Sequence, residues 1–319
     1  MNVTRKLLAL LAIGTLALAG CLEAKREITL NPDGSGKVLM ANKMKIPPML
    51  KGNPNFDADT MGKEMAREMA AKLIEGAQGI EAWTDVAYEM TDDGRMFATG
   101  VGYFKDVTKT QLEQGEQPAK LQWKKHPDGG MVLEYIMPES KKKDANAPKP
   151  KLTDEQIDEQ IEVFRQQYKA SKAMMGMMLK DMRIEQTFHL PGKVKDVRVF
   201  KKVDENTVQF AIDGNQILAV MDKVMADEDY LRATLKAGQN PMQSQAARDR
   251  MAKELFGGTE PPMVRVTGKM KPQFDYDREV AAATEGMEEM MKELKKPRKM
   301  PAAGGGSAPG AIRRGGGGQ

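Results

Sequence analysis

The sequence predicts an α+β fold, in which an antiparallel sheet built from β-hairpins packs against several helices. Pairs of alternating apolar segments flank short turns rich in Gly, Asp and Pro, which is the pattern of hairpins. Between these pairs, apolar residues recur at helical spacing. The hydrophobic share is 40% of 319 residues, enough for a sizeable core. Strand pairs separated by helices favour this class over a doubly wound parallel sheet.

The hairpins follow from the turns. The first is expected over residues 26–44, where Pro32-Asp33-Gly34-Ser35-Gly36 turns the chain. A second is expected over 80–104, with its turn at Asp92-Asp93-Gly94, and a third over 121–137, with its turn at Pro127-Asp128-Gly129-Gly130. Four later segments also alternate and are expected to be strands: 183–190, 194–203, 206–213 and 263–275.

Helices are expected where the apolar period lengthens, near 57–76, 153–182, 215–226, 228–237, 242–256 and 277–295. Thr153 and Gln156 have the spacing of a capping box, so the second helix should begin there. In the first helix the apolar residues Met61, Met65, Met69 and Leu73 recur every four positions. That stripe is the predicted core face of the helix.

The domain organisation is read from composition. Residues 1–20 form a leader, and 21–296 form one composite domain whose possible sub-lobes, 21–137 and 153–296, flank a polar, proline-rich connection at 138–152. Residues 297–319 are Gly- and Pro-rich and basic, and they are expected to be disordered. The charge of this tail favours either simple solvation or contact with anionic head groups or cell-wall polymers.

The leader carries the strongest signal. A basic pair, Arg5-Lys6, precedes an apolar run over Leu7–Leu16, which is of signal-peptide length and too short to span a bilayer. The next residues, Leu18-Ala19-Gly20-Cys21, resemble the lipobox of bacterial lipoproteins. The alternative is an uncleaved anchor, or a signal cut elsewhere, with Cys21 an ordinary residue.

The resemblance to lipoproteins implies cleavage between Gly20 and Cys21, with diacylglycerol on the Cys21 sulfur and an acyl group, such as palmitate, on the new amino group. Two or more acyl chains anchor a protein stably. Leu22 follows the cysteine in place of the Asp that retains lipoproteins in the inner membrane. The expected location is therefore the cell envelope, on the outer membrane facing the periplasm.

Enzyme and metal motifs are largely missing from the sequence. It has one cysteine and two histidines, and no P-loop, dinucleotide fingerprint or nucleophile elbow. His126 and His189 are expected to be solvated. A faint calcium-loop pattern at Asn53–Glu64 has Ala58 in the place of the required glycine. We expect no catalytic residue, no metal and no cofactor beyond the lipid on Cys21.

Methionine is unusually common, with 26 residues against 9 Phe, 6 Tyr and 2 Trp. Methionine is a good helix former and an adaptable core residue, so packing is the favoured interpretation. The run Met174-Met175-Gly176-Met177-Met178 leaves two other interpretations open, a partner groove and a copper(I) site.

Small residues share one face of the expected strand 95–104, namely Ala98, Gly100 and Gly102. Without bulky side chains there, a helix or a ligand can approach the backbone closely. If the domain has a ligand cavity, this is the predicted face.

The exported part resembles the LppM-type lipoproteins. The resemblance is carried by Glu27–Val38, directly after the cysteine, by Phe188-His-Leu-Pro-Gly-Lys-Val194 and by Thr207–Ile212. Phe210 stands where that family has a tryptophan-like aromatic. The resemblance implies an α+β envelope domain able to contact lipids or glycolipids, with no catalytic residues to carry over.

Three functions are compatible with these features. The first is a lipid-anchored binding or assembly module with an envelope protein as partner, and the second is a carrier of lipid or a small hydrophobic ligand. The third is an exported hydrolase that uses paired carboxylates. A formal net charge of only +4 excludes a strong basic field, and nucleic acid is not an expected partner.

Overall fold

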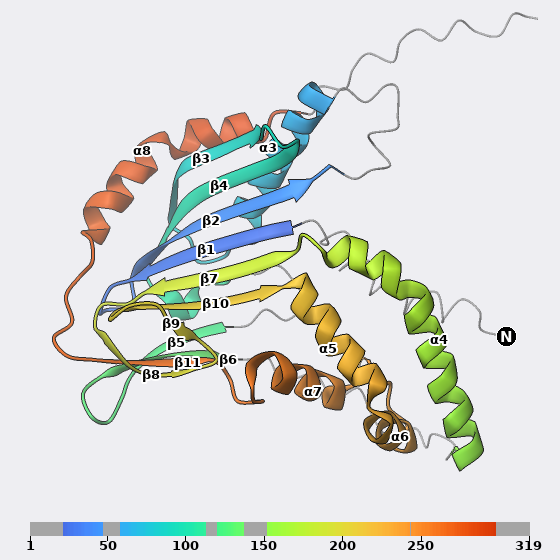
Figure 1. The fold of residues 1–319 in the computed structure, drawn as a ribbon. Helices are drawn as coiled ribbons and strands as arrows, with labels where there is room; N and C mark the ends of the chain where they lie inside the picture. Colours follow the sequence, from blue (N-terminus) through green and yellow to red (C-terminus); the bar gives the residue numbers. More distant parts are fainter. Residues whose placement is uncertain (1–21, 47–57, 113–119, 137–151, 243, 298–319) are drawn as a thin grey trace, which may run out of the picture.

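The computed structural model describes residues 22–46, 58–112, 120–136, 152–242 and 244–297. It confirms the α+β class: the described residues form two sheets and six α-helices (Figure 1). Cys21, the connection 138–152 apart from Leu152, and almost all of the 297–319 tail lie outside the described residues.

The larger sheet has seven strands in the order β3-β4-β2-β1-β7-β10-β9. Their bounds are β1 Leu22–Leu30, β2 Gly36–Lys45, β3 Ala82–Met90, β4 Arg95–Phe104, β7 Arg183–His189, β9 Lys201–Lys202 and β10 Thr207–Asp213. The first two predicted hairpins are present, and the Asp33 carboxylate fixes the first turn by accepting hydrogen bonds from the Ser35 amide (3.0 Å) and hydroxyl (2.7 Å).

The smaller sheet has the order β5-β6-β11-β8. Its strands are β5 Lys120–Lys125, β6 Met131–Ile136, β8 Lys193–Arg198 and β11 Met263–Thr267. The third predicted hairpin forms half of this sheet, and two strands from much later in the chain complete it.

The helices are α3 Ala58–Gly76, α4 Asp154–Leu179, α5 Gly214–Ala226, α6 Glu228–Lys236, α7 Gln245–Phe256 and α8 Tyr276–Leu294, with a short 3₁₀ turn at Val107–Lys109. The capping box predicted at Thr153 and Gln156 is formed, and Asp213 with Gln216 makes a second one. Local side-chain chemistry therefore sets where these helices begin.

One strand pairing differs from the antiparallel pattern. β1 lies parallel to β7, with Ile28 opposite Phe188 and Glu23 opposite Arg183. The two strands are separated by more than 150 residues of hairpins and helices, and a parallel pair needs such a long crossover. The larger sheet is therefore mixed, although its remaining pairs are antiparallel.

The core lies on one face of the larger sheet, which we call the inner face and which carries Ile28, Val38, Ala98 and Phe188. Helix α3 and the smaller sheet both pack on this face, and one hydrophobic cluster includes residues from Ile28 to Leu294. On the opposite, outer face, α8 covers β3 and β4 through Val280 and Ala283 (Figure 1). Both halves of the sequence therefore contribute to the same core.

Helix α3 is rotated from the predicted stripe. The residues buried against the sheet are small, Gly62, Ala66 and Ala70, together with Leu73 and Ile74. A Cβ at Gly62 would lie 2.7 Å from the Met90 sulfur, so the helix approaches the sheet closely because this position has no side chain. The predicted core face is therefore wrong for its three methionines. Beside the residues that contact the sheet lie Met61, Met65 and Met69, which are only half-buried.

Two predicted strands are shorter than expected. Residues 194–203 divide into β8 and β9, which join different sheets; between them Val199 has a φ of 71°. The strand predicted over 263–275 ends at Thr267, because Gly268 has a φ of 88° and turns the chain. Neither break is marked by a run of turn residues in the sequence.

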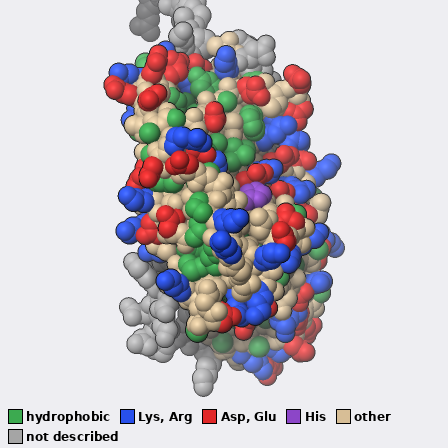
Figure 2. Space-filling model, turned by 90° about the vertical axis from the view of Figure 1, so that its left-hand side faces the viewer, with side chains coloured by type: hydrophobic (Ala, Val, Ile, Leu, Met, Phe, Trp, Pro, Cys, Tyr) green, Lys and Arg blue, Asp and Glu red, His purple; other side chains and the backbone are tan. Residues whose placement is uncertain are grey.

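The surface formed by α8 and the neighbouring strand ends mixes acidic and basic side chains, with apolar side chains only in small groups (Figure 2). This face includes the end of the larger sheet at which β1 ends (Figure 1). We refer to the opposite end, where Leu22, Lys45, Arg95, Arg183 and Asp213 lie, as the Leu22 end.

Candidate functional site

A cavity of about 570 Å³ lies on the inner face near the Leu22 end, between the sheet and α3. Most of its lining is apolar, and five of the lining residues are methionines. The residues are Leu22, Ala24, Arg26, Met40, Asn42, Met44, Met65, Glu68, Met69, Lys72, Leu73, Gly76, Met96, Leu112 and Ile184. Its volume is within the range of about 300–1,000 Å³ found for small-molecule sites.

The strand register builds the floor of this cavity. Ala24 lies opposite Asn42 on β2 and Ile184 on β7, and these three side chains point to the inner face. Ala24 is the small residue among them, and it leaves space where a larger side chain would fill the floor. The wall comes from α3, whose Met65 and Met69 face the cavity because the helix buries its alanines instead.

The predicted ligand face lies on the same side of the sheet but is filled by protein. A Cβ at Gly100 would lie 3.1 Å from Val86 and 3.4 Å from Trp83, and one at Gly102 would lie 3.1 Å from Trp83. Ala98 is fully buried in the core. The cavity is lined by Met96 of the same strand face, and Ala98, Gly100 and Gly102 are not among its lining residues. Small residues there accommodate the indole ring.

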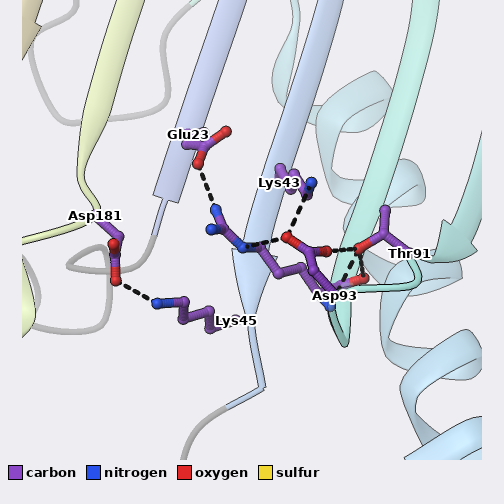
Figure 3. A network of polar contacts seen from close by, with 7 residues as sticks. Glu23, Lys43, Lys45, Thr91, Asp93 and Asp181 are labelled. Carbon is purple, nitrogen blue, oxygen red and sulfur yellow. Dashed lines mark hydrogen bonds and ion pairs between the residues drawn. The ribbon is translucent and has the colours of Figure 1, made fainter.

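A network of charged residues closes the Leu22 end on the outer face (Figure 3). The Arg95 guanidinium bridges Glu23 of β1 and Asp93, whose carboxylate is 2.9 Å from the Arg95 Nε and 3.3 Å from the Lys43 Nζ. Lys45, at the end of β2, pairs with Asp181 in the turn between α4 and β7. The network therefore connects three strand ends to the end of α4.

The same contacts lower carboxyl pKa values. The Thr91 hydroxyl, followed by Lys43 and Arg95, holds the pKa of Asp93 below its ordinary value of 3.8. Lys45 does the same for Asp181. A carboxyl group with a lowered folded pKa contributes stability above its unfolded pKa and loses it as the pH falls through the folded pKa. The ion pairs of Asp93 and Asp181 should therefore persist at neutral pH and weaken only below about pH 3.8.

The other predicted chemistry has no assembled site among the described residues. His126 is 2.6 Å from the Asp128 carboxylate in an exposed turn, and His189 is 3.3 Å from the Thr207 hydroxyl. No group of three or more His, Cys, Asp or Glu in the described part of the chain is arranged to hold a metal. Glu68 is the one acidic residue that lines the cavity, so a carboxylate pair is not placed there.

The methionine run does not form a single cluster. Met174 and Met177 are 57% and 71% exposed on α4, whereas Met175 and Met178 are half-buried. The cavity methionines come from other elements, Met40 and Met44 from β2, Met96 from β4, and Met65 and Met69 from α3. Sequence reasoning missed this site because its residues converge only through strand pairing and the rotation of α3.

Within the described residues, no helix combines the length and apolar character that crossing a bilayer requires. Cys21 directly precedes β1 in the sequence but lies outside the described residues.

No family model matches the chain, and no curated protein matches its sequence. Among solved structures, the folded domain of LppM from Mycobacterium tuberculosis resembles it over 60% of this chain and 82% of that domain, with 11% identity and a TM-score of 0.29. The similarity to a lipoprotein domain is thus weak, and at this level it supports no inference about the site.

Proposed function

We propose that this chain is a lipid-anchored envelope protein that binds the apolar part of a lipid-like amphiphile in the cavity beneath α3. One observation carries the proposal: the cavity is lined by Leu22, the residue that directly follows Cys21, which is expected to carry the lipid. An anchor there would hold the cavity close to the bilayer from which such a ligand comes. Binding, rather than catalysis, is the proposed activity.

The lining suits an amphiphile. Burying each methylene group contributes roughly 0.8 kcal/mol, so an acyl chain in an apolar cavity is bound mainly by the hydrophobic effect. Methionine side chains are flexible and polarizable, so five of them can adapt to chains of different shape. Arg26 and Lys72 are the cationic lining residues, against Glu68, which favours an anionic head group over a cationic one.

From the sequence alone, an assembly module is the first hypothesis and a lipid carrier the second. Because the fold has this cavity, we propose the carrier first. The anchor would keep the protein on the membrane, and the cavity would exchange its bound lipid with that membrane. The proposed location is still the outer membrane, facing the periplasm, because Leu22 rather than Asp follows the cysteine.

Filling the cavity tests the proposal. Ala24→Leu and Ala24→Phe place new side chains on the cavity floor, and Ala41→Phe is the matched control, since Ala41 lies on the neighbouring strand with its side chain on the outer face. The full chain is purified in detergent from bacterial cells, non-covalent lipid is extracted with organic solvent, and its amount per protein is measured by mass spectrometry.

We expect wild type and Ala41→Phe to retain similar amounts of one lipid class, with a several-fold loss in Ala24→Phe and a smaller loss in Ala24→Leu. Circular dichroism of all four proteins checks that they fold. Equal lipid content in the folded Ala24 variants and wild type would refute binding in this cavity.

A further inference from the structure

Helix α4 has one packed face and one exposed apolar face. Ile157 and Ile161 are buried against α6, and the Tyr168 hydroxyl donates a hydrogen bond of 2.9 Å to Asp222 on α5. On the other side, Val163 is 45% exposed, Met174 57% and Met177 71%. Val163, Ala170, Met174 and Met177 are spaced by seven, four and three residues, so they share one stripe of the helix. We call these four residues the α4 stripe.

The charges of α4 are divided along its length. Its first nine residues, Asp154–Glu162, contain five acidic and no basic side chains, whereas Val163–Leu179 contains three basic and no acidic ones. Lys169 and the C-cap residue Lys180 are exposed and lie beside the stripe on the helix surface. The apolar half of the helix is therefore also its cationic half, a combination typical of helices that lie in a membrane interface.

The fold places this half of α4 next to the proposed anchor. α4 ends at Leu179, and after a short turn β7 begins at Arg183, which lies opposite Glu23, two residues after Cys21. The ion pair between Lys45 and Asp181 holds this turn to the end of β2. In Figure 1, α4 forms the flank of the molecule on the side where β1 and β7 begin, with α5 on its inner side. The face at the opposite end mixes both charges (Figure 2).

We propose that the α4 stripe lies against the surface of the bilayer, with Lys169 and Lys180 near anionic head groups. This inference rests on the proposed anchor at Cys21. A tether this close makes the contact effectively intramolecular, so a small apolar area is sufficient to hold it. Basic residues near an anionic membrane surface add an electrostatic attraction to this contact. The protein would then have a fixed orientation, with the cavity end toward the membrane.

The test uses the full lipidated chain in vesicles of phosphatidylethanolamine and phosphatidylglycerol. Cys21 is the single cysteine of the sequence, and with lipid on its sulfur it cannot react with a thiol label. A cysteine introduced by Met174→Cys is then the thiol that takes the fluorescent label. Val203→Cys is the matched control, since Val203 is similarly exposed, at 54%. Its amide donates a hydrogen bond to the Thr207 carbonyl, and Thr207 is at the end of β10 that lies away from the Leu22 end. Brominated lipids quench a label that touches the bilayer, and palmitate incorporation is measured on the same samples.

We expect brominated lipid to quench the label at position 174 several-fold more than the label at 203, and the variant Lys169→Glu with Lys180→Glu to reduce that difference. Equal quenching at both positions in palmitate-bearing protein would overturn the inference and leave the anchor standing. A label at 174 that is shielded from aqueous iodide but not quenched by brominated lipid would show that another protein covers the stripe, which also overturns it. Absence of palmitate would overturn the anchor, and this inference with it.

Discussion

At the scale of single residues, Arg67 shows how a charged side chain can hold two distant helices together. It is 5% exposed on α3, and its guanidinium donates hydrogen bonds to the main-chain carbonyls of Glu293 (3.2 Å), Leu294 (3.2 Å) and Lys296 (2.6 Å) at the end of α8. Its other terminal nitrogen pairs with Glu64 at 2.6 Å. These carbonyls form the negative end of the α8 dipole, which a buried cation stabilises.

Replacing Arg67 by Met should therefore lower the free energy of unfolding by about 1.5–3 kcal/mol, the usual contribution of hydrogen bonds to a charged group. The midpoint of urea unfolding measures this change. Lys63→Met on the exposed side of the same helix is the control, and its effect should stay within about 0.5 kcal/mol. An unchanged midpoint for Arg67→Met would show that the contacts to α8 contribute nothing.

The sequence could not predict the role of Arg67, because its carbonyl partners are more than 220 residues away. The sequence also predicted the face that carries the small residues of β4, but not what packs against it. Ala98, Gly100 and Gly102 do share a face, but Trp83 from the next strand occupies the space above the two glycines. Which side chain covers a small residue depends on register, and the bulge in β3 between Thr84 and Ala87 is not marked in the sequence.

At the scale of elements, Gly214 determines how closely α5 can join α4. A Cβ at this first residue of α5 would overlap the carbonyl of Leu179, well inside van der Waals distance. Gly214→Ala should therefore destabilise the protein by about 1–3 kcal/mol through overpacking. Gly286→Ala, within α8, has no atom near the new Cβ and should instead stabilise it by about 0.5–1 kcal/mol. Thermal unfolding of both variants measures the two signs, and a shift in the same direction for both would contradict the packing described here.

The elements were predicted well where their signals are local. Hairpin turns and caps depend on residues within a few positions of each other, so β2, β4 and the start of α4 lie close to their predicted bounds. β1 ends near its predicted turn but begins four residues before the predicted start at residue 26. The parallel pairing of β1 with β7 and the division into β8 and β9 depend on distant partners, and the sequence does not mark them. The rotation of α3 shows the same limit, since Ala66 and Ala70 pack more closely than the methionines that mark the apolar stripe.

At the scale of the whole molecule, the Leu22 end brings together features that are scattered through the sequence. The cavity beneath α3, the charged network of Figure 3 and the C-terminal end of α4 all lie there, and Leu22, the residue after Cys21 in the sequence, lines the cavity. The sequence alone supplied the proposed anchor and the α+β class. The cavity could not be predicted, because its residues come from four strands, a helix and a loop that meet only in the fold.

In the proposed arrangement, lipid on Cys21 holds this end of the molecule at a bilayer. The most direct test is growth of bacterial cells with radioactive palmitate, followed by fractionation, for the wild type and Cys21→Ser. We expect label on the wild-type band in the membrane fraction, and no label on the variant, which should leave that fraction. An unlabelled wild type, or a variant that remains equally membrane-bound, would contradict it.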